Sequence, residues 1–324
     1  MEETKWKKLW EKCSGSVYQS WEWAEINRAK GKEPIFIDIE KEGELKAGIL
    51  CFAIEIKTPI GTKKMLFSEG TPIALDNVHL AELLGKFKEE SRKYFYGFIR
   101  PTFFRHDKSI FLNAGFYEAE NATISISLAP SIEELFNKLE KKSARWGVKK
   151  AEKEGVKIEG EYLKRELTDF YEIYTRTSEG QFAAEPFSFF ENLSMLERQK
   201  LAKFFIAKHE GNLIGGALLL MDKNYGVISL TSISDEGMKL QAMNLLYWEM
   251  IKYCKENGKK LIDLGGYMEE AKEGSKIYNI NKFKENFGGE VTKQPAYSTS
   301  KKYVFMTNLV RKFGFLKKLY KKEK

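Results

Sequence analysis

The sequence has few cysteines and no long apolar run, and these absences narrow the class of protein that it encodes. Its three cysteines, Cys13, Cys51 and Cys254, lie far apart without Cys-x-x-Cys or Cys-x-x-His spacing, so they suggest neither a disulfide framework nor a zinc site. The 324 residues contain no run of about eighteen apolar residues and no apolar leader near residue 1. We therefore expect a protein of the reducing cytoplasm that is neither secreted nor membrane-spanning.

Charged residues are abundant, and cations exceed anions. The chain has 54 Lys and Arg residues against 46 Asp and Glu residues, a formal net charge of +8. Such an excess favours a polyanionic partner, which is a tRNA, a nucleotide-linked precursor or an anionic membrane surface, and charge alone does not choose among them. The length and a hydrophobic content of 43% suit two cores better than one, so two domains are expected.

The stretch at 259–290 carries the most informative local pattern. Residues 259–264 predict a short buried strand, because an apolar run ends at the paired glycines Gly265 and Gly266. Paired glycines permit a tight bend or the close approach of a ligand, so we expect the strand to end there at an open site. A helix is predicted over 274–287. Its apolar residues are spaced three, three and four apart, which predicts one buried face: Ile277, Ile280, Phe283 and Phe287.

Three segments of the chain resemble signatures of the FemABX family. Asp-Leu-Gly-Gly at 263–266, a variable loop and Phe-Lys-Glu-Asn-Phe-Gly-Gly-Glu at 283–290 resemble its main signature. Tyr-Gln-Ser-Trp-Glu-Trp-Ala at 18–24 is similar to its amino-terminal element, and Arg-Trp-Gly-Val-Lys-Lys-Ala-Glu at 145–152 is similar to its central helix. FemABX proteins move an amino acid from aminoacyl-tRNA onto a cell-wall peptide. The resemblance spans nearly the whole chain and implies the same class of reaction.

The two halves of the sequence repeat one order of elements. Glu-Gly-Glu-Leu-Lys-Ala-Gly at 42–48 aligns without a gap with Glu-Gly-Asn-Leu-Ile-Gly-Gly at 210–216, and each lies in a predicted hairpin followed by a strand, a helix and a strand. A chance recurrence of a common hairpin turn is the alternative. The order is similar to the GNAT acyltransferase fold. It implies an α/β protein of two tandem GNAT-like domains, at 1–128 and 129–304.

Two further segments complete the predicted architecture. A long helix is predicted over 131–154, and no sustained heptads follow it, so the coiled-coil arm of some FemABX members is not expected. Residues 305–324 predict a basic amphipathic helix. We expect this helix to pack back on the first domain, as the last segment of FemABX proteins does, and the alternative is contact with an anionic membrane or with tRNA.

The sequence lacks the turn with which GNAT enzymes bind acyl-CoA. Neither half has Arg/Gln-x-x-Gly-x-Gly/Ala, and the segment at 234–242 has one glycine and two acidic residues where the pyrophosphate would lie. Aminoacyl-tRNA is therefore the donor that the resemblance implies. An acyl-CoA-dependent N-acyltransferase and a non-catalytic peptide- or glycan-binding protein are the alternatives. Peptide-bond formation from an aminoacyl ester needs no metal and no redox cofactor, so none is expected.

The candidate site residues follow from the same resemblance. Phe283 and Lys284 match a Phe-Lys pair at the donor end of the FemABX channel, where the lysine stabilises developing negative charge; a solvated helix lysine is the alternative. Asp263 is either a general base with a raised pKa or a cap of the glycine turn. The remaining substrate-binding candidates are these: Arg100, Arg145, Gly265, Gly266 and Tyr267.

The acceptor is expected to be an amine of a cell-envelope precursor, either a peptide or a lipid-linked one. The sequence departs from members that bind UDP-linked precursors. It has no lysine directly after the Trp-Ala element, and the segment at 177–180 reads Thr-Ser-Glu-Gly where an arginine is common. Arg100-Pro-Thr replaces an Arg-x-Asp-Pro element. We expect a cytoplasmic protein, either free or at the inner membrane surface.

Overall fold

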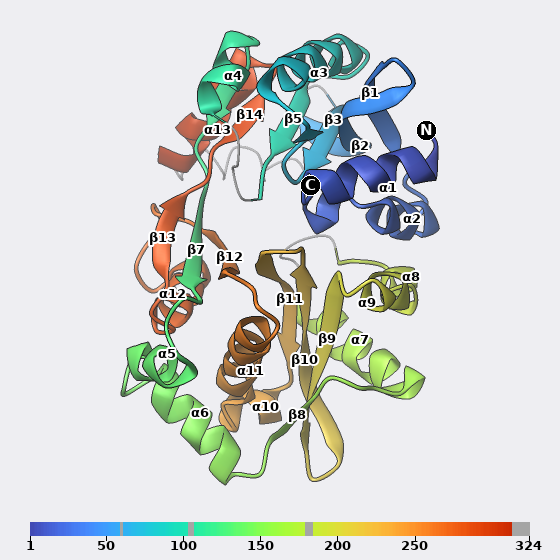
Figure 1. Cartoon of the computed structure of the whole chain (residues 1–324). Coiled ribbons are helices and arrows are strands. Elements are labelled where there is room, and N and C mark those ends of the chain that lie inside the picture. Colours follow the sequence, from blue (N-terminus) through green and yellow to red (C-terminus); the bar gives the residue numbers. More distant parts are fainter. Residues whose placement is uncertain (59–60, 103–106, 179–183, 313–324) are drawn as a thin grey trace. The chain divides into compact units, whose positions relative to one another are not determined.

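The computed structural model describes most of the chain. The described residues are 1–58, 61–102, 107–178 and 184–312. The chain divides into two compact units (Figure 1): unit 1 comprises Met1–Ala122 and Lys293–Lys324, and unit 2 comprises Thr123–Thr292. The expected division was 1–128 and 129–304.

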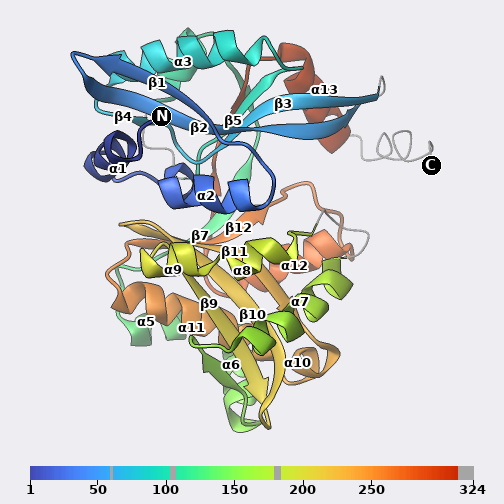
Figure 2. The same cartoon turned by 90° about the vertical axis from the view of Figure 1, so that its right-hand side faces the viewer.

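Unit 1 is built on a seven-stranded sheet in the order β1-β2-β3-β5-β14-β6, with β4 paired to β2. Helix α3 packs on one face of the sheet, and α1 and α2 pack on the other (Figure 2). The elements are α1 (Glu3–Lys12), η1 (Val17–Gln19), α2 (Trp21–Ala29), β1 (Ile35–Lys41), β2 (Glu44–Thr58), β3 (Gly61–Glu69), β4 (Ile73–Ala74), α3 (Asn77–Ser91), β5 (Gly97–Arg100), α4 (Lys108–Asn113), β6 (Tyr117–Ala119), β14 (Ala296–Ser298) and α13 (Lys301–Lys312).

The segment at 18–24, which resembles the amino-terminal FemABX element, has a structural role in unit 1. The buried side chain of Gln19 donates to the carbonyl of Glu69 at 2.7 Å and accepts from the amide of Leu50 at 2.7 Å, so it joins η1 to β3 and β2. Ser20 then begins α2, because its hydroxyl accepts from the amide of Trp23.

Unit 2 is built on a second seven-stranded sheet, in the order β13-β7-β12-β11-β10-β9-β8. Helices α5, α6 and α11 cover one face, and α7, α8 and α9 cover the other (Figures 1 and 2). The elements are β7 (Ala122–Ser127), α5 (Ile132–Lys138), α6 (Ala144–Lys153), β8 (Lys157–Glu159), α7 (Lys164–Ser178), α8 (Phe187–Glu191), α9 (Ser194–Arg198), β9 (Ala202–His209), β10 (Asn212–Met221), β11 (Tyr225–Ile233), α10 (Asp235–Lys239), α11 (Ala242–Glu256), β12 (Leu261–Tyr267), α12 (Lys276–Glu285) and β13 (Glu290–Lys293).

The predicted repeat is present in the backbone. The turns of the β1–β2 and β9–β10 hairpins have the same conformation, with positive φ at both central residues: 53° and 75° at Glu42 and Gly43, and 49° and 82° at Glu210 and Gly211. In unit 1, β2 and β3 are antiparallel and β5 is parallel to β3. In unit 2, β10 and β11 are antiparallel and β12 is parallel to β11. The expected tandem GNAT-like α/β fold is confirmed.

Strand pairing explains where the boundary between the units falls in the sequence. Strand β7 joins the sheet of unit 2, although it lies before residue 128. Strand β14 joins the sheet of unit 1, between β5 and β6, although it lies after all the other strands in the sequence. Helix α13 follows and packs on β14 and β6. The rest of the predicted carboxy-terminal helix, 313–324, lies outside the described residues.

The long helix predicted over 131–154 is wrong, because α5 and α6 are separate helices. Leu139 takes an extended conformation and is buried. The amide of Glu140 then donates to the carbonyl of Asn286 at 2.8 Å, a contact that a continuous helix would not permit. In the described part of the chain, no helix is both long and apolar enough to cross a membrane.

Candidate functional site

Strand β12 departs from its neighbour where its polar residues begin. Its parallel pairing with β11 joins Tyr225 to Leu261 and ends with the pair Val227–Asp263. The strand continues to Tyr267, so the prediction that it ends before Gly265 is wrong. Gly265 has φ +90°, a conformation that side-chain-bearing residues avoid, and this residue bends the strand away from β11.

Asp263 holds this bend. Its carboxylate is 3% exposed and accepts hydrogen bonds from the hydroxyl of Thr123 and, at 2.7 Å, from the amide of Gly265. The second bond is the cap considered from the sequence. Burial raises the pKa of Asp263, while the two hydrogen bonds and the positive charge of Lys284 act against that rise. The carboxyl group thus combines a capping geometry with a raised proton affinity.

Helix α12 is buried along only part of the face that its apolar spacing predicts. Lys284 is only 8% exposed and Asn281 and Phe287 are also buried, whereas Ile277 and Ile280 are each 41% exposed. At about 100° per residue, the two isoleucines lie within about 40° of Lys284 around the helix. The apolar face therefore exists, but only its carboxy-terminal half is covered, and a lysine lies within it. The predicted burial of the isoleucines is wrong.

The ammonium group of Lys284 is bound at the bend of β12. Its Nζ donates to the carbonyl oxygen of Gly266 at 2.9 Å. Burial lowers the pKa of Lys284 to about 8, and the nearby charge of Asp263 acts against that fall. A lysine with this pKa changes its protonation state close to neutral pH. The arrangement therefore offers a proton donor or acceptor at the end of β12.

Side chains on both sides of Lys284 fasten α12 to the end of β12. The amide group of Asn281 donates to the carbonyl of Met268 at 2.8 Å. The hydroxyl of Tyr267 donates to one oxygen of Glu285 at 2.6 Å, and Lys282 donates to the other oxygen at 2.6 Å. Tyr267, expected at the substrate, thus binds the helix, and its hydrogen bond to Glu285 raises its pKa.

Phe283 packs into an aromatic cluster beneath the helix. Its ring lies 5.0 Å from the ring of Tyr247 in an edge-to-face arrangement and 5.3 Å from the ring of Phe287. Tyr247 comes from α11, so the cluster joins α12 to the long helix of unit 2. The ring thereby sets the rotation that brings Lys284 to Gly266.

The structure gives each candidate arginine a partner within its own unit. Arg145, on α6, donates through Nη2 to the carbonyls of Asn137 and, at 3.0 Å, Leu139, so its guanidinium closes the end of α5. Its Nε is buried without a hydrogen-bond partner. Arg100 belongs to unit 1, where it pairs with Glu69 at 2.6 Å and lies over the ring of Phe67.

Sequence reasoning missed two polar residues of the site. Thr123 lies 140 residues from its partner Asp263, and no local pattern links them. Asn281 had a detectable signal, because it lies three residues before Lys284 and therefore shares its side of the helix. In the described ranges, no three His, Cys, Asp or Glu side chains form a group that could hold a metal ion.

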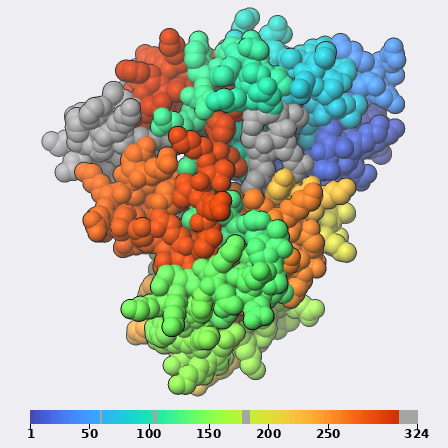
Figure 3. All heavy atoms as spheres, turned by 60° about the vertical axis from the view of Figure 1, so that its left-hand side comes forward, coloured from blue at the N-terminus to red at the C-terminus, as the bar shows by residue number. Residues whose placement is uncertain are grey.

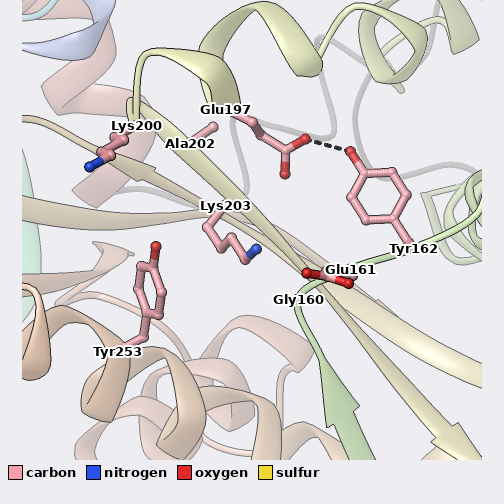
Figure 4. Close-up of a pocket in the computed structure, with 8 residues that line it drawn as sticks. All are labelled: Gly160, Glu161, Tyr162, Glu197, Lys200, Ala202, Lys203 and Tyr253. Carbon is pink, nitrogen blue, oxygen red and sulfur yellow. Dashed lines mark hydrogen bonds between the residues drawn. The ribbon is translucent and has the colours of Figure 1, made fainter.

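Unit 2 also has a pocket of about 470 Å³ at the outer edge of β9 (Figure 4). Strand pairing connects Ala202 on this edge to Leu220, then to Val227 and then to Asp263. The pocket is therefore three strand spacings, about 14 Å, from Asp263. None of the candidate residues lines it.

The polar groups of this pocket protect the strand edge. Glu197 accepts from the hydroxyl of Tyr162 at 2.7 Å (Figure 4). Its other oxygen accepts from the amide of Phe204 at 3.1 Å. Strand β8 ends at Glu159, so without Glu197 this amide of β9 would have no strand partner on that side. The carboxylate is thus already used inside the protein.

Comparisons with known proteins agree with this architecture. Residues 140–273 match the family described as an acetyltransferase (GNAT) domain. The crystal structure of FemX is similar to the chain with a TM-score of 0.74 and 17% identity, covering 96% of this chain and 98% of FemX. No curated protein matches the sequence.

Two other solved structures share the fold. L-PGS from Bacillus licheniformis has a TM-score of 0.62 at 14% identity, covering 96% of each chain. A C-terminal domain assigned to a lysylphosphatidylglycerol synthetase from Agrobacterium fabrum has a TM-score of 0.64 at 14% identity, covering 94% of this chain and 95% of that one. The protein therefore shares the fold of FemX, and its residues 140–273 match the GNAT domain family.

Proposed function

We propose that the protein is an aminoacyltransferase of the FemABX family that forms a peptide bond between an amino acid carried by tRNA and an amine of a cell-envelope precursor. The fold shared with FemX and the GNAT domain support a transferase. The observation that carries the proposal is Lys284, a buried lysine with a lowered pKa at the end of a GNAT strand, within a segment that resembles the FemABX signature.

Lys284 has the chemistry that this reaction needs. The acceptor amine attacks the ester carbonyl carbon, the carbonyl oxygen gains negative charge, and the ribose oxygen then leaves with a proton. As an ammonium, Lys284 stabilises the charged oxygen by a charge-assisted hydrogen bond. Because its pKa is about 8, it also passes a proton to the ribose oxygen and regains one from the attacking amine.

Asp263 acts on this lysine through the backbone. Its bonds with Thr123 and Gly265 set the bend of β12, and the bend places the carbonyl of Gly266 against Lys284. We assign Asp263 and Thr123 as positioning residues. The Gly266 carbonyl orients the lysine in the absence of substrate, and the reacting ester takes over the ammonium when it binds.

The GNAT match is a specific reason to keep acyl-CoA transfer as the second candidate. The start of α11, where a pyrophosphate would bind, disfavours it. Asp235 and Glu236 lie just before it, and Gly237 is buried. Gln241 enters the helix with φ 61°, and its side chain bonds to Asn244. In the third alternative, a non-catalytic binding protein, Lys284 serves only to fasten α12.

The acceptor belongs to the envelope in this proposal, and the protein acts in the cytoplasm. The name of lysylphosphatidylglycerol synthetase gives a lipid as that protein's product, so a lipid-linked acceptor is included beside a peptide.

One assay separates the three candidates. The full chain is incubated with precursor extract and labelled donor, which is either aminoacyl-tRNA or acyl-CoA. We expect label from aminoacyl-tRNA to enter an amine-bearing precursor, and the Lys284→Met variant to give no such product above background. Label arriving from acyl-CoA instead supports the second candidate. Transfer from neither donor, with extract components retained by the protein, supports the third.

A further inference from the structure

A concentrated basic segment lies next to the helix that carries Lys284. We call residues 138–150 the basic elbow; it comprises the end of α5, the connecting segment and most of α6. It holds one carboxylate, Glu140, against six cations: Lys138, Lys141, Lys142, Arg145, Lys149 and Lys150. The proposed transfer step uses none of these cations.

Packing turns the cations of the basic elbow outward. Ala144, Val148 and Ala151 are buried at helical spacing, in the core that includes α11. Gly147 allows a closer approach still, because a Cβ there would lie 2.5 Å from the side chain of Asn244. The rotation of α6 is therefore set by its small residues. Lys149 is exposed on the other side, and Lys141 and Lys142 are exposed on the connecting segment. The chain around these residues forms part of the surface in Figure 3 (green).

Three of the six cations have neutral partners, so their charge stays available, while Lys142 lies near the one carboxylate, Glu140. Lys149 lies 5.9 Å above the ring of Phe136, and Arg145 lies on carbonyl oxygens at the end of α5. Lys150 donates to the carbonyl of Lys239 at 2.9 Å and lies 5.3 Å from the ring of Trp146. These contacts hold the side chains in place without cancelling their charge.

Two backbone contacts join the basic elbow to the site helix. The amide of Glu140 donates to the carbonyl of Asn286 at 2.8 Å, and Asn286 ends the helix of Lys284. A Cβ on Gly288, just after that helix, would lie 3.0 Å from the carbonyl oxygen of Lys138. Figure 1 shows α12, α5 and α6 following one another on this side of unit 2. A ligand on the basic elbow thus lies next to the end of the helix of Lys284.

The chemistry of the surface favours RNA over a lipid membrane. A membrane-binding helix needs a continuous exposed apolar stripe, and the stripe of α6 is covered. Throughout 138–150, all of which the structure describes, Trp146 is the one exposed large apolar side chain, at 49%. A single aromatic ring among cations suits stacking on a base beside phosphate contacts.

We propose that the basic elbow binds the sugar-phosphate backbone of the donor tRNA close to its aminoacylated end. The proposal rests on the proposed function, because it names where that donor is held. It assigns phosphate contacts to Lys142 and Lys149 and a stacking contact to Trp146.

The test compares two double charge reversals. The first is Lys142→Glu with Lys149→Glu, and the control is Lys164→Glu with Lys223→Glu, two exposed lysines of unit 2 outside the basic elbow. Binding of deacylated tRNA is measured by fluorescence anisotropy over a range of salt concentrations, and thermal melting verifies folding. We expect the first pair to raise Kd roughly tenfold or more and to reduce the salt dependence by about two phosphate contacts. The control pair should change Kd less than about twofold.

Transfer kinetics separate this proposal from the proposed function. With the first pair, KM for aminoacyl-tRNA should rise while kcat stays near that of the unmodified protein, and use of an aminoacylated CCA trinucleotide should be unchanged. If no donor supports transfer yet the first pair still loses tRNA, the proposed function fails and the RNA surface stands. Equal tRNA binding by both pairs overturns the RNA surface. The RNA surface is also overturned if the first pair loses binding to anionic lipid vesicles while its binding of tRNA stays intact.

Discussion

At the scale of the residue, the protein is defined by the burial of one lysine. An exposed lysine would keep the proton that makes it a permanent cation, whereas burial lowers the pKa of Lys284 to about 8. The neighbouring Lys282 shows the contrast, because its hydrogen bond to Glu285 raises its pKa. The pKa values of these two lysines on one helix thus shift in opposite directions, and only that of Lys284 suits proton transfer near neutral pH.

Lys284→Met should remove activity and leave the fold intact. The methionine keeps an apolar stem of similar length but has no charge, so turnover in aminoacyl transfer should fall on the order of a hundredfold or more. The melting temperature should stay level or rise, since no ammonium is left to desolvate. Lys282→Ala is the matched control and should retain nearly full turnover. Full transfer activity in Lys284→Met would show that the lysine only fastens α12.

The same residue should make stability depend on pH in a defined window. The pKa of Lys284 is lowered from 10.5 to about 8 on folding, so between these values the unfolded chain binds the proton that the folded chain has lost. The free energy of unfolding therefore rises with pH from about 8 to about 10.5. Below this window the ammonium is buried in its charged form, which lowers the free energy of unfolding by about 3 kcal/mol.

The measurement is the difference in unfolding free energy between Lys284→Met and the unmodified protein. Subtraction removes the titration of all other groups that the two proteins share. We expect the variant to be more stable at pH 7 and its advantage to shrink by pH 10. A constant difference across that range would mean that the lysine titrates as an exposed one does.

At the scale of the element, the bend of β12 matters more than the strand itself. Asp263 and Gly265 turn the backbone, and the turned carbonyl of Gly266 meets α12. The paired glycines Gly265 and Gly266 thus have different conformational requirements. Gly265 has positive φ, whereas a Cβ on Gly266 would meet nothing within 4 Å.

Alanine substitutions should distinguish these two glycines. Gly265→Ala forces an alanine into the left-handed region, which costs about 1–2 kcal/mol, and it shifts the carbonyl that holds Lys284. We expect lower unfolding free energy and reduced turnover. Gly266→Ala should be close to neutral in both denaturant unfolding and transfer assays. Equal effects of the two substitutions would contradict the geometry of the bend.

At the scale of the whole molecule, the sheet of unit 1 is completed by the end of the chain. Tyr297 of β14 pairs with Ile99 on β5 and with Glu118 on β6, and its ring stacks 4.2 Å from that of Phe111. The residue is fully buried. Unit 2, by contrast, is one continuous segment with its own core.

Fragments of the chain should therefore behave differently. Residues 123–292 should unfold cooperatively alone, because their sheet and core are complete. Residues 1–128 should not, since β5 and β6 lack the strand between them. Joining 1–122 to 293–312 through a flexible linker should restore a cooperative transition in circular dichroism. An equally sharp transition for 1–128 alone would show that β14 is dispensable.

The sequence by itself determined the local features of this protein. The Glu-Gly pairs at 42–43 and 210–211 predicted two hairpin turns, and both turns form, with positive φ at both central residues. Gly288, just after α12, has the left-handed φ of 76° that ends a helix. The order of hairpin, strand, helix and strand predicted the tandem fold. Each turn, cap and single element depends on residues within a few positions of one another, so each leaves a readable pattern, and the order of the elements can be read from those patterns.

Only the tertiary structure decided how the site is assembled. The apolar spacing of α12 identified one side of the helix, but it did not reveal that only half of that side is covered or that a lysine is buried there. Thr123 reaches Asp263 across 140 residues, and β14 crosses to unit 1 from the far end of the chain. Pairings of this kind depend on which surfaces meet after folding, and spacing along the chain does not encode them.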